Sequence, residues 1–208
     1  MIQDVIKKIH WLGHDGFRID STKIIYFDPY QIKSMVPADI IFISHDHFDH
    51  CSEDDIKKIQ KKDTVIVTDA ATAKKLKGTI KVVKPGDRLT VENIAVAVVP
   101  SYNTNKNFHP KASGMLGFII TIDGVRVYHA GDTDFIPEMS SIKTDIALLP
   151  VSGTYVMTAE EAVSAALAIK PKVAIPMHFA AIVGSEQDAK LFAEKLAGKV
   201  EVVILKQE

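Results

Sequence analysis

Apolar and polar residues alternate in short runs along most of this chain, a pattern typical of β-strands. These runs are rich in β-branched residues, and turn-forming residues separate them. They predict strands at residues 6–11, 16–20, 23–27, 39–44, 64–68, 80–83, 94–99, 117–122, 125–129, 146–149, 172–176 and 201–205. The dipeptide Asp123-Gly124 between two of these runs predicts a tight hairpin, because it accepts positive φ angles.

Helical spacing of apolar residues is confined to fewer segments, which begin at the capping residues Ser52, Thr158 and Ser185. The predicted helices cover residues 52–62, 158–170 and 185–198. Strands with helices in both halves of the chain predict a layered α/β fold, with the helices packed outside sheets. No repeat and no linker rich in Pro, Gly or Ser interrupts the sequence, so residues 1–208 are expected to form a single domain.

Composition narrows the classes of partner. Of 208 residues, 47% are hydrophobic and 25% are charged, and the formal net charge is −1. This balance gives no electrostatic reason to expect a nucleic acid or a membrane as partner, so a small-molecule substrate is expected. Cys51 is the only cysteine, which excludes a disulfide within the chain, and we expect it to be a small buried residue. No apolar run approaches the roughly 20 residues of a membrane-spanning helix, so a cytoplasmic location is expected.

Candidate chemistry concentrates in FISHDHFDHC, residues 42–51. His45 and His47 alternate, so in an extended chain their side chains project to the same side. Asp49 and His50 are adjacent and need a turn to point to the same place. Imidazole nitrogens and carboxylate oxygens are ligands for zinc, iron and manganese. A solvated loop or a helix cap is the alternative, but so dense a group of ionisable residues behind an apolar strand favours a metal site.

The pattern His45-x-His47-x-Asp49-His50 resembles the HxHxDH signature of the metallo-β-lactamase superfamily. The resemblance implies an αββα sandwich of two mixed sheets with helices on the outer faces. It implies that the first two histidines bind one metal ion and that Asp49 and His50 bind a second. It also implies a later histidine, a bridging aspartate and a final histidine at strand ends. Asp132 and His178, which follow predicted strands, fit the last two positions.

The remaining ligand is open between two residues. Asn103 stands where relatives often carry the histidine, whereas His109 comes six residues later in a longer loop. We expect His109 to be the ligand, because imidazole binds zinc better than an amide does. In the alternative, His109 points to solvent and Asn103 binds the substrate.

Two further residues are candidates for supporting roles. Asp28, in an Asp-Pro pair after a predicted strand, is placed to fix the tautomer of a ligating histidine, although a plain turn is an equal alternative. His14, in the segment WLGHDGF, resembles a small-subfamily signature whose histidine lies beside the metals. A role in substrate binding and catalysis, or in supporting a ligand, is expected for it.

The resemblance extends from Gly13 to His178 and is closest to small hydrolases of the ascorbate-6-phosphate lactonase type. It implies two divalent ions, zinc foremost with Mn²⁺ or Fe²⁺ as alternatives. A metal-bound hydroxide then cleaves an ester, lactone, amide or phosphoester, and Asp49 is essential to catalysis because it holds a metal ion.

One rival is an iron-dependent oxidoreductase of the persulfide dioxygenase type. An RNA-processing nuclease is a second rival, although basic stretches are short. A non-enzymatic metal-binding module is a third, and the intact ligand set counts against it. The substrate and the oligomeric state are not predicted.

Overall fold

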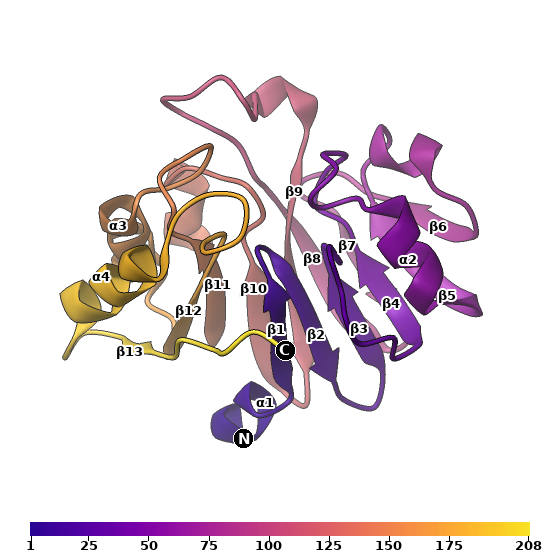
Figure 1. Cartoon of the computed structure of the whole chain (residues 1–208), viewed down its shortest axis with the longest axis horizontal. Coiled ribbons are helices and arrows are strands. Elements are labelled where there is room, and N and C mark those ends of the chain that lie inside the picture. Colours follow the sequence, from indigo (N-terminus) through magenta and orange to yellow (C-terminus); the bar gives the residue numbers. More distant parts are fainter.

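Two β-sheets face each other in the computed structural model, which describes residues 1–208, and helices lie outside them (Figure 1). The αββα arrangement expected from the sequence is therefore confirmed. A large buried cluster of aliphatic and aromatic side chains fills the space between the sheets, including Phe27, Phe42 and Phe118. Burial of apolar side chains here is the main force that holds the sheets together.

The first sheet is built from the N-terminal part of the chain. Its strands follow sequence order: β1 (Ile9–Gly13), β2 (Gly16–Asp20), β3 (Ile24–Phe27), β4 (Ala38–Phe42), β5 (Gln60–Thr68) and β6 (Thr79–Val82). The first three strands are antiparallel, and β3 to β6 are parallel to one another.

The second sheet is built from the remainder of the chain. Its strands are, in order across the sheet, β13 (Glu201–Val202), β12 (Val173–Met177), β11 (Ile146–Pro150), β10 (Val125–His129), β9 (Leu116–Ile122), β8 (Ile94–Pro100) and β7 (Arg88–Val91). Strands β10 to β13 are parallel, and β7 to β10 are antiparallel.

Helices cover part of each outer face. The four α-helices are α1 (Ile2–Ile6), α2 (Glu53–Ile59), α3 (Ala159–Ile169) and α4 (Glu186–Leu196), and short 3-10 helices are η1 (Thr72–Lys75), η2 (Lys111–Ser113) and η3 (Pro137–Ser141). Helix α2 packs on the first sheet through Ile56 and Ile59, while α3 and α4 lie against β11 and β12 (Figure 1). None of these helices has the length and apolar character required to span a membrane.

Several sequence predictions need correction. The strand predicted at 6–11 is the short helix α1 followed by β1, and the edge strand β7 was not predicted. The helix predicted at 52–62 ends at Ile59, because the following lysine-rich residues extend β5 and Gln60 pairs with Ala38. The strand predicted at 201–205 is only the two-residue β13. Three of these errors lie at edge strands, and the fourth lies at the exposed start of β5; side-chain patterning is weak at such places because few residues are buried.

The parallel strands determine where polar side chains gather. The loops that follow β3, β4, β10, β11 and β12 leave the carboxyl ends of parallel strands, and such ends lie at one edge of a sheet. The two sheets bring these edges together at one end of the molecule, the upper end in Figure 1. Residues from distant parts of the sequence therefore meet there.

Candidate metal centre

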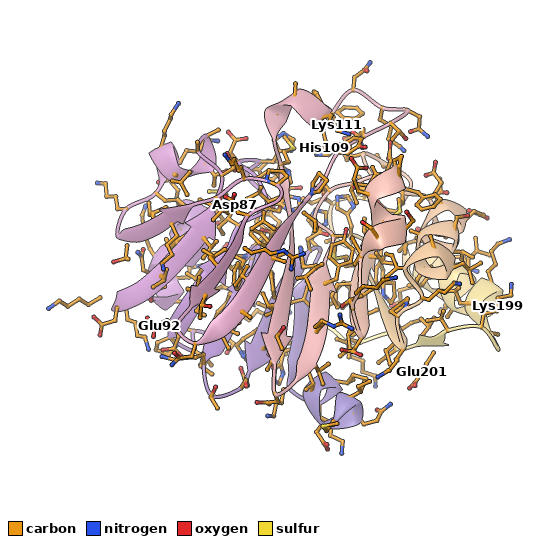
Figure 2. The ribbon with its side chains drawn as sticks, turned by 180° about the vertical axis from the view of Figure 1, so that it is seen from behind. Asp87, Glu92, His109, Lys111, Lys199 and Glu201 are labelled. Atoms are coloured by element: carbon orange, nitrogen blue, oxygen red, sulfur yellow. The ribbon has the colours of Figure 1, made fainter.

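Seven ligands predicted from the sequence gather at this end of the sandwich: His45, His47, Asp49, His50, His109, Asp132 and His178. The first four follow β4, and the others follow β8, β10 and β12 in turn. Figure 2 shows His109 at the loop end of the molecule, far from Glu201 on β13. Most of these side chains are buried, so the cluster is enclosed by the loops around it.

Three histidines form a first candidate metal position. The donor atoms of His45, His47 and His109 lie within 4.8 Å of one another, and His45 Nε2 is 3.0 Å from His47 Nδ1. His109 Nε2 also lies 3.2 Å from Asp132 Oδ2. Zinc bonds of about 2.0 to 2.2 Å place neighbouring ligand atoms roughly 3 to 3.6 Å apart. The separations of His45 from His47 and of His109 from Asp132 lie in this range, so these side chains are spaced as ligands of one ion are.

A second position, richer in oxygen, lies beside the first. His50 Nε2 is 3.4 Å from Asp132 Oδ1 and 3.9 Å from Asp49 Oδ2, and His178 Nε2 is 3.4 Å from Asp132 Oδ2. Because Asp132 approaches His109 through the same oxygen, its carboxylate lies between the two positions. The structure thus places Asp132 where a bridging carboxylate is expected.

Several buried polar atoms of this cluster have no hydrogen-bond partner, and they show whether its residues fit metal ions. His50 Nε2, His178 Nε2 and Asp132 Oδ1 are buried without a hydrogen-bond partner, although they lie within 4 Å of one another's side chains. Buried polar atoms are nearly always paired, and leaving one unpaired costs about 1 to 3 kcal/mol. Lone pairs that converge without hydrogen bonding need a shared cation, so the donor set fits divalent metal ions.

Hydrogen bonds from Asp28 and Ser44 orient the histidines of the HxHxDH motif. Asp28 Oδ2 accepts from His50 Nδ1 at 2.8 Å, which leaves His50 Nε2 free to face the centre. The same carboxylate accepts from the backbone N–H of Ser44 at 2.7 Å and from its hydroxyl at 2.6 Å. Ser44 Oγ in turn accepts from His45 Nδ1 at 2.9 Å. Asp28 is therefore placed to fix the orientation of two candidate ligands, and its supporting role stays a prediction.

Similar contacts orient the other two histidines. His178 Nδ1 donates to Ser152 Oγ at 2.9 Å, so its Nε2 faces the centre. His109 Nδ1 lies 3.2 Å from Asn103 Oδ1, which also accepts from the His109 backbone N–H at 2.9 Å. Asn103 thus stands behind His109 and not at the metal positions. The geometry places His109, and not Asn103, among the candidate donors, and its role as a ligand stays a prediction.

The loop that carries His109 is anchored by a buried carboxylate. Asp134 accepts from the backbone N–H groups of Thr104 and Asn105 at 2.7 and 3.2 Å and from Lys106 Nζ at 2.7 Å. Asn103 Nδ2 donates to the same carboxylate at 3.2 Å. These bonds stabilise a loop that has little regular secondary structure, and so they hold His109 in place.

The turn between β1 and β2 contributes His14 and Asp15. His14 Nε2 lies 3.1 Å from Asp49 Oδ2, which places it beside the second position, where the sequence predicted a supporting or catalytic residue. Asp15 is fully buried, and neither of its carboxylate oxygens has a hydrogen-bond partner. His14 has a φ of 51°, so this turn holds a non-glycine residue in the left-handed region, as often occurs at functional sites.

Gly131 and His129 fix the direction of Asp132. Gly131 has a φ of 63°, and a Cβ atom there would lie 2.7 Å from the carbonyl oxygen of Leu116. Only glycine fits this turn without a backbone shift. His129 stacks on Phe27, donates through Nε2 to the carbonyl oxygen of Asp15 at 2.9 Å, and accepts from the Gly131 N–H. This histidine is therefore a positioning residue between the two sheets.

The protein environment separates the histidines electrostatically. Burial lowers the pKa of His45 and of His47, so both stay neutral and keep a lone pair for a metal ion. For His178, burial acts to lower the pKa, but the charges of Asp132 and Asp15 together outweigh it and raise the pKa to about 9. Asp132 likewise raises the pKa of His50 against the effect of burial. Without metal, the second position therefore holds protons that an ion displaces.

Cys51 lies under α2, where burial raises the pKa of its thiol to about 12. The thiol is therefore protonated at neutral pH and unsuited to nucleophilic attack.

Sequence reasoning missed Asp15, Ser44, Ser152 and Asp134 as contributors to the site. Ser44 and Asp15 each adjoin a predicted site residue, so sequence proximity was the available signal. Ser152 and Asp134 act through contacts between distant segments, and no local pattern marks them. For His129, the sequence left a supporting role and a plain strand position open.

Comparison with known proteins agrees with this geometry. Residues 8–178 match the family model described as the beta-lactamase superfamily domain. The chain is 30% identical to the UPF0173 metal-dependent hydrolase of Pyrococcus abyssi, with 96% of each chain covered, and 33% identical to that of Archaeoglobus fulgidus, again with 96% of each covered. A crystal structure described as a metal-dependent hydrolase from Parabacteroides distasonis superposes with a TM-score of 0.85 at 34% identity, covering 96% of this chain and 93% of that one.

The narrower likeness to ascorbate-6-phosphate lactonase stays a prediction. On this fold, donor set and likeness, the chain belongs to the metallo-β-lactamase superfamily and is a metal-dependent hydrolase.

Proposed function

We propose that this hydrolase uses two divalent ions, zinc at least at the first position, to cleave an ester or lactone of a small molecule. The observation that carries the proposal is Asp132, whose carboxylate lies 3.2 Å from His109 Nε2 on one side and 3.4 Å from the Nε2 atoms of His50 and His178 on the other. Bound divalent ions supply hydroxide at neutral pH and polarise the electrophilic oxygen of the substrate.

Asp49 and His14 supply a negative charge and a proton-binding group at the second position. Asp49 is mostly shielded from solvent, which acts to raise the pKa of its carboxyl, but the contact with His14 and the charge of His50 together outweigh burial and lower this pKa. It is therefore ionised at neutral pH and available to the second ion. His14 stands at the same position with its Nε2 toward Asp49, close enough to hold or move a proton there.

The rim of the site favours an uncharged substrate with an apolar group. Phe108 and Tyr155 pack edge to face at 4.6 Å next to His109, and both are partly exposed. On the opposite side, Tyr30 and Phe48 pack at 5.8 Å near His14, and Phe48 is 66% exposed. Exposed aromatic rings on two sides of a polar centre are suited to contact alkyl or aryl groups.

The cations near the rim are already paired. Lys106 binds Asp134 at 2.7 Å, and Lys111 binds Glu138 at 2.8 Å, so neither offers a free charge to a phosphate. We therefore place esters and lactones ahead of phosphoesters. A cavity of about 760 Å³ elsewhere lies on the outer face of β7–β9 and contains none of the candidate ligands.

Metal quantification followed by a substrate panel tests the proposal. The zinc, manganese and iron forms are assayed on p-nitrophenyl butyrate, an aryl lactone, bis-p-nitrophenyl phosphate and a β-lactam. We expect about two ions per chain and the highest kcat/KM on the ester or lactone. Hydrolysis of none of these substrates by the loaded protein contradicts the proposal. A single iron with oxygen consumption on a persulfide favours the dioxygenase instead.

Variants distinguish the catalytic role of Asp49 from the contribution of the aromatic rim to substrate binding. Asp49→Ala is expected to abolish hydrolysis while the protein stays folded. Phe108→Ala is expected to raise KM for p-nitrophenyl butyrate more than for the acetate, because the longer acyl group contacts more of the ring. Leu167→Ala, which alters an exposed apolar residue on α3, is the matched control and leaves both values unchanged.

A further inference from the structure

Asp15 is a buried carboxylate without a structural partner. It lies in the turn between β1 and β2, its exposed fraction is zero, and neither Oδ1 nor Oδ2 makes a hydrogen bond. A carboxylate that serves the fold would normally accept several hydrogen bonds, as Asp28 and Asp134 do in this chain. Its chemistry therefore points to a cation.

The backbone around Asp15 is fixed from three sides. The carbonyl oxygen of His14 accepts from Trp11 Nε1 at 2.9 Å and from the His178 N–H at 3.0 Å. The carbonyl oxygen of Asp15 accepts from His129 Nε2 at 2.9 Å. These bonds join the turn to both sheets, so the backbone of Asp15 is held in place beside the site.

The carboxylate of Asp15 faces the second metal position. Its Oδ2 lies 3.5 Å from His14 Nε2, 3.8 Å from His178 Nε2 and 4.0 Å from His50 Nε2. The donor atoms of these four residues all lie within 4.8 Å of one another. With metal bonds of about 2.1 Å, donors on one ion are roughly 3 to 4.2 Å apart, so the separations of Asp15 from His178 and from His50 fit ligands that share an ion, while His14 Nε2 is nearer to Asp49 Oδ2, at 3.1 Å.

We propose that Asp15 is a fifth protein ligand of the second metal ion, beside Asp49, His50, Asp132 and His178. This inference rests on the two-metal centre of the proposed function. Five donors, three of them carboxylates, suit a six-coordinate ion such as Mn²⁺ or Fe²⁺ better than four-coordinate Zn²⁺. The first position, with three histidines and Asp132, keeps the tetrahedral donor set that suits zinc. The two positions therefore select different metals.

Metal titration of the apo-protein tests this assignment. Wild type and Asp15→Asn are titrated with Mn²⁺ and with Zn²⁺ by calorimetry, and bound metal is counted by mass spectrometry. We expect two ions for wild type, and for Asp15→Asn an affinity for Mn²⁺ at the second position at least ~10-fold weaker, with the first position retained. Asp69→Asn is the matched control, because Asp69 is buried but fully hydrogen-bonded to the turn that follows it.

Thermal unfolding of the apo-proteins distinguishes a ligand from a structural residue. Because Asp15 makes no hydrogen bond, we expect apo Asp15→Asn to melt at or above the wild-type temperature, while its gain in melting temperature on adding Mn²⁺ is smaller. Lower apo stability than in Asp69→Asn, or two Mn²⁺ ions bound as tightly as in wild type, overturns the proposal.

A cobalt titration of wild type requires no variant. Four-coordinate Co²⁺ absorbs visible light strongly, and six-coordinate Co²⁺ absorbs weakly. We expect one equivalent to give strong bands and the other weak ones. Equal, strong bands for both equivalents, or uptake of only one ion, refute the assignment of Asp15. Uptake of two ions as expected, without hydrolysis of any substrate, contradicts the proposed function but leaves the assignment of Asp15 in place.

Discussion

The stability of the metal-free protein and that of the metal-loaded protein should depend on pH in opposite ways. The reason is that the second metal position holds protons when no metal ion is bound. In the apo-protein, burial acts to lower the pKa of His178, but the negative charges of Asp132 and Asp15 together outweigh it and raise this pKa from 6.5 to about 9. A group whose pKa is raised on folding stabilises the native state fully below its unfolded pKa, and this stability is lost as the pH rises through the folded pKa. The apo-protein should therefore lose stability between about pH 6.5 and pH 9.

The magnitude follows from the same shift. At 1.36 kcal/mol per pKa unit, His178 contributes up to about 3 kcal/mol to the free energy of unfolding at pH 6, and most of it is gone at pH 10. His50 adds to the loss, because its pKa is also raised. The pKa values of His45 and His47 are lowered, so their titration affects stability only below about pH 6.5 and does not mask this window.

Urea denaturation of chelator-treated protein at pH 6, 7.5, 9 and 10 measures the effect. His178→Gln should remove the part of the slope that His178 contributes, because glutamine does not titrate, and should leave the part that His50 contributes. Metal-loaded protein should show the opposite trend, since ions bind only to the deprotonated imidazoles and gain affinity as the pH rises. Apo stability that is constant or increases from pH 6.5 to 9 would refute the electrostatic description of this site.

Three further predictions concern single residues. Asp28→Asn, which retains a side chain tolerant of positive φ, should weaken metal binding about 10- to 100-fold in calorimetry, because His50 loses its charged acceptor. Gly131→Ala should lower the free energy of unfolding by about 1 to 3 kcal/mol and reduce metal content; Gly124→Ala, also at positive φ but with open space around it, should cost only about 1 kcal/mol. Cys51→Ala should retain full hydrolysis, and alkylation by iodoacetamide should not inactivate wild type, since the thiol is buried and protonated.

The sequence predicts the candidate site better than it predicts the edges of the fold. His45 to His50 follow one strand, so their spacing alone indicates their use, and Gly131-Asp132 and His178 follow apolar runs that are easy to recognise. The choice of His109 over Asn103 required the three-dimensional structure, because it depends on how a loop folds around Asp134.

The missed features have physical causes. Helix α1 is five residues long, and β7 is an edge strand whose residues are mostly exposed, so neither carries a clear apolar period. Asp15 is a single aspartate in a turn, and its sequence neighbours do not distinguish a buried ligand from an ordinary turn residue. Only the packing of the β1–β2 turn against β12 and His129 shows that it is buried.

The candidate ligands come from both sheets, and this has a consequence for how the molecule folds and opens. His45 to His50 follow a strand of the first sheet, whereas His109, Asp132 and His178 belong to the second. Each sheet contains only part of the donor set, so ions must enter late in folding, after the halves have docked. Once bound, they act as a cross-link between segments more than a hundred residues apart. Amide hydrogens along the seam between the sheets should then exchange with solvent far more slowly than in the apo-protein, which makes the metal content a determinant of native-state lifetime.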